Sequence, residues 1–144
     1  MPDRPDLLGS LYPITKALRQ IEDESAAERG ITMWQYAILA VADHQPGLNQ
    51  GDVARLLDYS KNRIVADIDH LEEAGLLRRT SGSDRRANLL SITRSGRSVL
   101  RVVRAEIHRR EDLLLAGLSP TARSEFDRIV HRLGAQVRAA RPGS

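Results

Sequence analysis

The signals that begin helices in the middle of the chain constrain its fold more than any other feature. Asn49 stands where a helix N-cap would, and Asp52 follows three residues later to favour the free backbone amides, which predicts a short helix over 50–57. Ser60 is the next N-cap candidate, so only residues 58–59 separate this helix from a second one. Two short helices joined by a tight turn are typical of a helix-turn-helix motif.

The second of these helices is predicted to be amphipathic. Ile64, Ile68 and Leu71 recur at i, i+4 and i+7, so they share one face, and Gly75 ends the helix. The polar face begins with the run Lys-Asn-Arg at 61–63. One side of this helix is therefore expected to join a core, and the other side is expected to meet solvent or a partner.

The periodicity changes immediately after this helix. Residues 76–80 and 88–93 are strand candidates, in which Leu90 and Ile92 alternate with polar residues, and the turn-rich sequence 81–84 follows the first. These features predict a β-hairpin, and a helix-turn-helix followed by a hairpin is a winged helix. The loop end of the hairpin, where we expect most exposure to solvent, is basic. Arg85 and Arg86 lie in the loop, and Arg78 and Arg79 lie on the first arm.

Two helices are predicted before the helix-turn-helix motif. The first covers about 6–28, and the second, over 33–44, begins with a capping box between Thr32 and Gln35. The first helix carries an apolar stripe of Leu7, Leu11, Ile14, Leu18 and Ile21. Trp34, Ala37, Ile38 and Val41 of the second helix are expected to face the core.

Two further helices are predicted after the hairpin. Thr93 can cap a long helix that reaches about residue 116, and Ser119-Pro120 opens a last helix. The apolar side of the long helix consists of Val99, Val102, Val103 and Ile107, and the stripe of the last helix consists of Ala122, Phe126, Ile129, Leu133 and Val137.

The apolar stripes of the first and last helices exceed what a winged core of three helices can cover. Exposed apolar surface costs about 25 cal/mol per Å². A second copy of the chain is the simplest cover, and packing of both helices on their own subunit is the alternative.

Taken together, the predicted helices and the hairpin give a fold class that is mainly α with a small β-hairpin (α+β).

The charge distribution favours nucleic acid as a partner. Residues 60–110 hold 12 basic and 6 acidic side chains, whereas residues 1–59 hold 5 basic and 9 acidic ones. Only Lys16 and Lys61 among the 22 basic residues are lysine, and the planar fork of arginine suits phosphates and base edges. The alternative is an arginine-rich genome with ordinary solvated helix faces.

Several classes of protein are disfavoured by what the sequence lacks. It contains no cysteine, which removes disulfides, thiolate metal sites and thiol-based oxidant sensing. The longest uncharged apolar runs, 37–42 and 113–118, are far shorter than the roughly 20 residues that cross a bilayer. The first ten residues include Asp3 and Asp6 and lack the apolar core of a secretion signal, so we expect a cytoplasmic protein without a membrane partner.

No motif predicts an enzyme, a cofactor or a metal site. The sequence has no phosphate-binding glycine loop, no HExxH and no recognisable nucleophile and base pair. Its four histidines lie on different predicted segments, and the candidate pair weighed at helical ligand spacing is His108 with Glu111 or Asp112. We expect no catalytic residue, no cofactor and no metal ligand.

The chain resembles the MarR family of transcriptional regulators over nearly its whole length. The resemblance is carried by ITMWQYAIL at 31–39, the segment 49–57, SKNRIVADIDHLEEAGLL at 60–77 and SDRRANLLSIT at 83–93, followed by Thr93-x-x-Gly96. It implies an obligate homodimer that binds double-stranded DNA at a palindromic operator, with repression as the family default. The alternative is an architectural or protein-binding winged helix without a small-molecule effector.

The resemblance also implies a division of the chain. Residues 1–30 would form a dimerisation helix, 31–95 the winged helix-turn-helix DNA-binding domain, and 96–144 the C-terminal dimerisation helices. The terminal helices of both subunits would then form one domain.

The candidate DNA contacts fall on the second motif helix and the hairpin. The helix N-terminus offers free amides to a phosphate, Arg63 suits guanine, Asn62 suits adenine, and Val65 and Ala66 suit thymine methyl groups unless Val65 is buried. The resemblance implies that Arg86 enters the minor groove braced by Asp84, and the alternative is a surface salt bridge between them. The full set is Ser60, Lys61, Asn62, Arg63, Val65, Ala66, Arg78, Asp84, Arg85 and Arg86.

Four further side chains near this surface have open roles. Asp67 and Asp69 do not favour phosphate, so they either face away from DNA or orient a neighbouring arginine. Tyr59, which stands where many relatives have a small apolar residue, either packs, the interpretation we favour, or reaches a phosphate. The sequence gives no account of Asp58.

Many MarR proteins are released from DNA by a small aromatic acid or another ligand. A planar anion needs an apolar slot with a cation, and the candidates here are Tyr12, Lys16, Arg19, Trp34 and Ile38. The alternative is that Trp34 belongs to the core and Tyr12 to the dimer contact.

Overall fold

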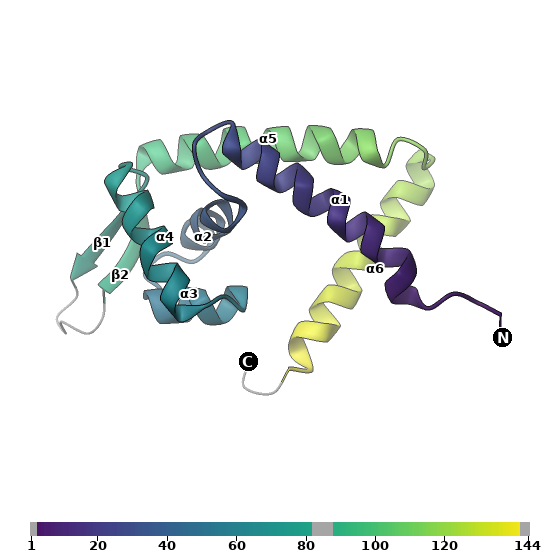
Figure 1. Ribbon diagram of the computed structural model, residues 1–144, viewed down its shortest axis with the longest axis horizontal. Helices are drawn as coiled ribbons and strands as arrows, with labels where there is room; N and C mark the ends of the chain where they lie inside the picture. Colours follow the sequence, from purple (N-terminus) through teal and green to yellow (C-terminus); the bar gives the residue numbers. More distant parts are fainter. Residues whose placement is uncertain (1–2, 82–87, 142–144) are drawn as a thin grey trace. The chain divides into compact units, whose positions relative to one another are not determined.

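The computed structural model describes residues 3–81 and 88–141, and these residues form six helices and two strands (Figure 1). The elements in chain order are α1 (Leu7–Ala27), α2 (Met33–His44), α3 (Gln50–Leu57), α4 (Lys61–Glu73), β1 (Leu77–Ser81), β2 (Asn88–Ile92), α5 (Arg94–Leu114) and α6 (Pro120–Ala139). The chain divides into two compact units, Met1–His108 and Arg109–Ser144. None of the helices in the described ranges is long and apolar enough to cross a membrane.

The predicted helix starts are confirmed by their side-chain caps. Thr32 Oγ1 accepts a hydrogen bond from the Gln35 amide at 3.1 Å, and the Gln35 side chain accepts one from the Thr32 amide at 3.0 Å. Asn49 and Asp52 form the same reciprocal pair. The Ser60 hydroxyl accepts from the Arg63 amide at 3.4 Å. Each cap satisfies a backbone donor that has no partner inside the helix.

The core of the first unit lies among α2, α3, α4, the hairpin and the first half of α5. The predicted inward face of α4 is confirmed, because Ile64, Ile68 and Leu71 are all buried. The other large side chains that are almost fully buried include Ile38, Leu39, Val53, Leu77, Leu90 and Val103.

The core face predicted for α2 is confirmed for Ile38, which is buried, and for Val41, which packs against the core from a partly buried position. Trp34, Ala37 and Val41 are only partly buried, whereas Tyr36, Leu39 and Ala42 are buried with Ile38. The α2 helix has apolar residues around most of its circumference, so periodicity alone does not indicate which side is deepest. The positions of α3, α4 and β2, which all contact α2, decide this.

The hairpin joins α4 to α5 through a close approach at its base. β1 and β2 are antiparallel, with Leu77 opposite Ile92. Thr93 Oγ1 accepts from the Gly96 amide at 2.9 Å and donates to the Gly75 carbonyl at 2.6 Å, which confirms Thr93 as the cap of α5. A Cβ at Gly96 would lie 2.1 Å from the Leu76 carbonyl oxygen, so only glycine fits there without a shift.

The first strand begins one residue later than the sequence pattern predicts. Gly75 has a φ of +74°, and the amide of Leu76 donates to the carbonyl of Leu71 at 2.9 Å, so Leu76 completes the C-terminal cap of α4. Pairing with the second strand therefore starts at Leu77.

The C-cap of α3 is Asp58, whose backbone adopts the left-handed conformation with a φ of +51°. Aspartate tolerates this conformation better than most residues do.

The second unit contains the end of α5 and the whole of α6. Ser119 caps α6 and Pro120 is its first residue, as predicted. Arg123 bonds to Asp127 on the same helix and to Asp112 near the end of α5. Although α6 carries a continuous apolar stripe, the helix has no buried residue, and Leu133 is 54% exposed.

Candidate nucleic-acid interface

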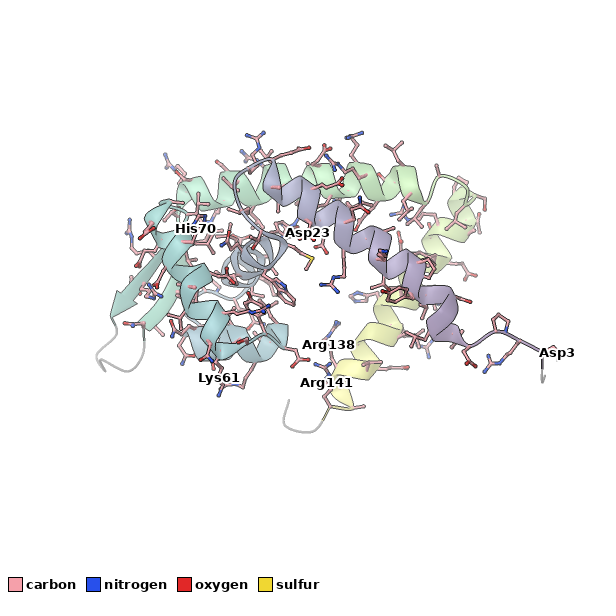
Figure 2. All side chains as sticks on the ribbon, viewed as in Figure 1. Asp3, Asp23, Lys61, His70, Arg138 and Arg141 are labelled. Carbon is pink, nitrogen blue, oxygen red and sulfur yellow. The ribbon has the colours of Figure 1, made fainter. Side chains whose placement is uncertain are left out.

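The first turn of α4 presents three polar side chains to solvent. Lys61, Asn62 and Arg63 are all exposed, and they follow directly on the Ser60 cap. Figure 2 shows Lys61 at the beginning of the helix, on its outer side. Because the opposite face of α4 is buried in the core, these side chains extend from a rigid support.

The exposed surface continues along the helix through two apolar side chains. Val65 is 37% exposed and Ala66 is exposed, so the interpretation of Val65 as a buried residue is wrong. The helix therefore has a polar first turn followed by a small apolar patch on its outward side. Such a surface suits base edges and methyl groups of a duplex.

The acidic residues of α4 bind protein groups on the flanks of the helix. Asp67 accepts hydrogen bonds from Gln35 Nε2 at 3.1 Å and from the Tyr59 hydroxyl at 2.5 Å. Arg79 of β1 pairs with Asp69 at 2.7 Å and with Glu72 at 3.1 Å. The alternative in which Asp69 orients a neighbouring arginine is thus confirmed, and Arg79 is held by protein carboxylates.

Tyr59 packs rather than extending to solvent, as the favoured interpretation predicted. Its ring stacks on Trp34, with 4.4 Å between ring centroids and 16° between planes. Burial raises the pKa of the Tyr59 hydroxyl to about 12, and the bond to the Asp67 carboxylate adds to the rise. The sequence patterns did not predict the bond between Tyr59 and Asp67.

The predicted wing contacts are only partly within the described residues. Arg78 is exposed on β1. Asp84, Arg85 and Arg86 lie outside the described residues, so minor-groove insertion and a surface salt bridge both stay predictions.

The candidate effector residues do not form one site. Tyr12, Lys16 and Arg19 share one side of α1 and line a shallow hollow of about 310 Å³. Trp34 lies on α2 against Tyr59. Ile38 is fully buried in the core, so its assignment as a ligand contact is not supported by its position.

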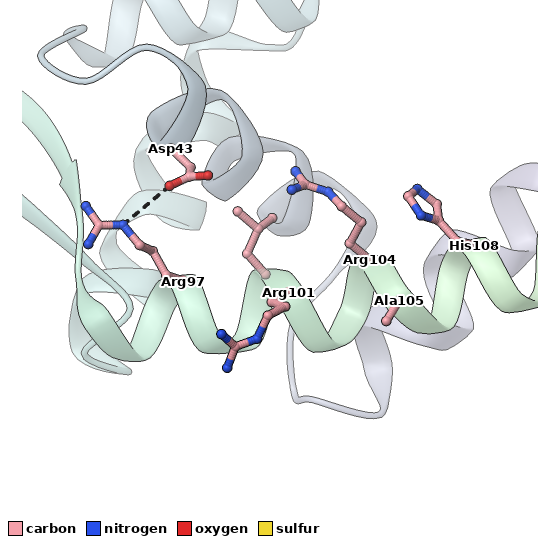
Figure 3. A pocket seen from close by; sticks show the side chains of 7 residues that line it. Asp43, Arg97, Arg101, Arg104, Ala105 and His108 are labelled. Atoms are coloured by element: carbon pink, nitrogen blue, oxygen red, sulfur yellow. Dashed lines mark ion pairs between the residues drawn. The ribbon is translucent and has the colours of Figure 1, made fainter.

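A second hollow, of about 430 Å³, lies beside α5 and was not found from the sequence (Figure 3). Arg97, Arg101, Arg104 and His108 line it at helical spacing, and this spacing was the available signal. Asp43 at the end of α2 pairs with Arg97 at 3.4 Å. The hollow has a positive rim, but it is wide open, and we assign it no ligand. Within the described ranges, no group of three or more potential ligand residues could hold a metal ion.

Comparison with known proteins places this arrangement among transcriptional regulators. The model of the MarR family matches residues 29–87. A putative transcriptional regulatory protein for the hcr operon of Thauera aromatica is 32% identical over 118 residues, which cover 81% of this chain and 71% of the relative. The transcriptional repressor Rv2887 of Mycobacterium tuberculosis is 26% identical over 125 residues, which cover 86% of this chain and 90% of the relative.

Solved structures share the fold. A crystal structure of MarR matches with a TM-score of 0.85 and 26% identity, over 96% of this chain and 95% of that chain. The structure of Rv2887 in complex with DNA matches with a TM-score of 0.81 and 23% identity, over 91% and 99% of the two chains. Rv2887 has also been solved in complex with salicylic acid and with p-aminosalicylic acid. The matches in sequence over most of the chain, together with the shared winged-helix fold, establish that this chain belongs to the MarR family.

Proposed function

We propose that the protein is a sequence-specific transcriptional regulator, a repressor, that binds a palindromic operator in the cytoplasm as a homodimer. It acts by binding and not by catalysis. The observation that carries this proposal is the exposed first turn of α4, because its polar side chains stand on a helix whose other face is locked in the core. The DNA complex of the relative Rv2887 supports the same use of the fold.

In this proposal α4 enters the major groove. The backbone amides at its N-terminus and the Ser60 hydroxyl face a phosphate, while Arg63 and Asn62 face guanine and adenine. Lys61 adds a mobile positive charge near the backbone. Val65 and Ala66 lie where thymine methyl groups would pass, and their exposure supports this role.

The hairpin supplies a second contact in the adjacent minor groove. Arg86, braced by Asp84, is proposed to enter the groove, with Arg85 nearer the tip and Arg78 on the first arm. A narrow A/T-rich groove concentrates negative potential and attracts a guanidinium group. The exposure of Arg78 and the engagement of Arg79 by protein carboxylates support a division of labour between these two neighbours.

The terminal helices are proposed to form the dimer domain, with boundaries at 1–30 and 96–144. Exposed apolar side chains support this, because such a surface is costly in water until a partner covers it. The most exposed of them are Leu7, Leu8, Leu11 and Tyr12 on α1, Leu113 on α5, and Val130, Leu133 and Val137 on α6. The proposed cover is the same set of helices in a second copy.

A small aromatic or otherwise anionic effector is proposed to bind at α1. The hollow there offers the Tyr12 ring beside the cations Lys16 and Arg19, which suits a planar anion. Trp34 is retained as a candidate contact on α2. The salicylate complexes of Rv2887 support this chemical class. Such a ligand would release DNA by favouring a state in which the two recognition helices have the wrong spacing.

The test begins with selection of DNA fragments from the source genome by the purified protein. The best fragment and a scrambled duplex of the same composition are then titrated at one salt concentration. We expect a palindromic site preferred by at least about 10³-fold. Equal affinity for both duplexes would replace operator recognition with an architectural role, and absence of binding to either would contradict the proposal.

A variant tests the assigned contact at the same time. Arg63→Ala is expected to lower affinity for the selected duplex by about 1–3 kcal/mol and to relax preference at one base position. Arg132→Ala removes another exposed arginine, on α6, and serves as the control for net charge. A uniform loss of affinity across all base substitutions for Arg63→Ala would show that Arg63 contacts a phosphate instead.

A further inference from the structure

The hydrogen bonds that meet at Asp67 join three parts of the first unit. Asp67 lies on α4, Gln35 lies on α2, and Tyr59 lies in the connector between α3 and α4. Each carboxylate oxygen has its own donor, since Oδ1 accepts from Gln35 and Oδ2 from Tyr59. The carboxylate therefore links α2, the connector and α4 through polar side chains.

The Gln35 donor is itself held in place. Its side-chain carbonyl accepts from the Thr32 amide at 3.0 Å, so the other end of the amide is directed to Asp67. Gln35 is 6% exposed. The Tyr59 ring is fixed by stacking on Trp34. Both donors are thus oriented before they meet the carboxylate, which reduces the entropy lost in forming the two bonds.

The position of Asp67 around the helix gives these bonds a geometric effect. At 100° per residue, Asp67 lies about 65° to one side of the buried face of Ile64, Ile68 and Leu71. Glu72, which pairs with Arg79 of the hairpin, lies about 75° to the other side. The helix is therefore held by directional bonds on both flanks, whereas its apolar face makes contacts that have no preferred direction.

We propose that Asp67 is a positioning residue that fixes the rotation of α4 about its own axis and thereby decides which side chains reach the base edges. This inference rests on the proposed function of α4 as the recognition helix. A rotation of 100° would exchange the place of Asn62 for that of Arg63, so even a fraction of it would misdirect both. The role explains why a carboxylate is present one turn after Arg63, on a helix that approaches phosphates.

The experiment compares Asp67→Asn with Glu73→Gln. Both variants remove one negative charge from α4, and Glu73 is exposed and outside the network. An asparagine offers one acceptor oxygen where two donors converge, so one bond is lost while the shape is kept. The measured quantity is the ratio of affinity for the duplex selected by the wild-type protein to affinity for a scrambled duplex, at one salt concentration.

We expect Asp67→Asn to lower this ratio at least about tenfold and Glu73→Gln to leave it within about twofold. Tyr59→Phe, which keeps the ring stacked on Trp34 but removes the hydroxyl, should lower the ratio in the same direction. Trp34 is the only tryptophan, so its fluorescence reports the change at the stacked pair directly. Recovery of the ratio in Asp67→Glu would further support a carboxylate in this role.

A purely stabilising role would give a different pattern. In that case Asp67→Asn and Tyr59→Phe would lower the melting temperature, yet keep the wild-type affinity ratio at a temperature where both are folded, and the inference would be overturned. If Asp67→Asn does not fold, Tyr59→Phe decides the outcome alone. A wild-type protein that selects no duplex would instead contradict the proposed function itself, before any variant is measured.

Discussion

Helices α4 and α6 begin alike and end in opposite environments. Each starts with a serine cap and carries an apolar stripe along one face. In α4 the stripe is completely buried, whereas α6 has no buried residue and Leu133 is 54% exposed. The same sequence pattern therefore indicates a helix with an apolar side in both cases, but it does not say whether the chain itself or a second copy covers that side.

The polar contacts of the two helices differ in the same way. Asp67 and Glu72 of α4 bind residues of α2, the connector and β1. The described ion pairs of α6 join residues three or four apart on the helix, apart from the bond between Arg123 and Asp112. Exposed pairs of that kind contribute little, typically up to about 1 kcal/mol each. The helix whose polar side chains bind neighbouring elements, α4, is the one proposed to recognise DNA.

The largest expected effect is on the buried stripe. Leu71→Ala should lower the free energy of unfolding by about 2–5 kcal/mol, because the lost side chain leaves a cavity in a closed core. Chemical denaturation followed by circular dichroism at fixed protein concentration measures it. A loss below about 1 kcal/mol would mean that the core around α4 collapses around the gap and is less rigid than proposed.

A charge placed on the exposed stripe of α6 should weaken the homodimer. Leu133→Asp is expected to raise the dissociation constant of the homodimer at least about 100-fold, because a charge would have to be buried at the contact between copies. Ala135→Asp adds the same charge on the opposite side of α6 and is the control. Sedimentation velocity over a range of concentrations gives both values, and an unchanged dimer in Leu133→Asp would refute the use of this face.

The junction between the hairpin and α5 should be sensitive to a single methyl group. Gly96→Ala is expected to cost roughly 1–3 kcal/mol, because its Cβ would be pressed against the backbone of Leu76. Gly117→Ala meets no atom within 4 Å and should change stability by a few tenths of a kcal/mol, about the effect of chain stiffening alone. Thermal unfolding of both variants gives the comparison, and equal melting temperatures would contradict it.

The two serine caps separate stability from function. Ser60→Ala and Ser119→Ala should each cost about 1 kcal/mol, since each hydroxyl satisfies one backbone amide. Only Ser60→Ala should also weaken DNA binding, because only that cap belongs to α4. Urea denaturation and titration of the selected duplex distinguish the two effects. Equal DNA affinity in both variants would remove Ser60 from the interface.

The smallest effect concerns pH and the Tyr59 hydroxyl. Its pKa is raised to about 12 in the folded protein from an ordinary value near 10, so the folded state keeps this proton longer than the unfolded state does. The stabilisation is fully present below about pH 10 and is lost as the pH rises through about 12. The difference in stability between wild type and Tyr59→Phe should therefore shrink over this window, and a constant difference would show that the hydroxyl is not held as described.

Much of the fold could be predicted because the relevant signals are local. The caps at Thr32, Asn49, Ser60 and Ser119, and the glycine at the end of α4, act within one helical turn, and each element boundary lies within about two residues of its predicted place. The first strand differs by one residue because Leu76 belongs to the helix cap. The exposed polar turn of α4 follows from the same local pattern.

The depth of each side chain in α2 could not be predicted. Ile38 fits both a core position and a ligand pocket by sequence pattern, and in the structure it is fully buried. Trp34, expected in the core or in a pocket, instead stacks on Tyr59 from a different element. An apolar helix with neighbours on several sides gives no periodic signal for which side is innermost.

The sequence by itself determined the order and type of the elements, the winged helix and the polar face of α4, because caps, turns and amphipathic periods depend on residues one or two turns apart. The tertiary structure decided which acidic groups of α4 bind which partners. Asp67 meets Gln35 across 32 positions in the chain, and Asp69 and Glu72 meet Arg79 of the hairpin. Such contacts depend on how each helix is rotated against its neighbours, and that rotation is set by the packing of the whole core.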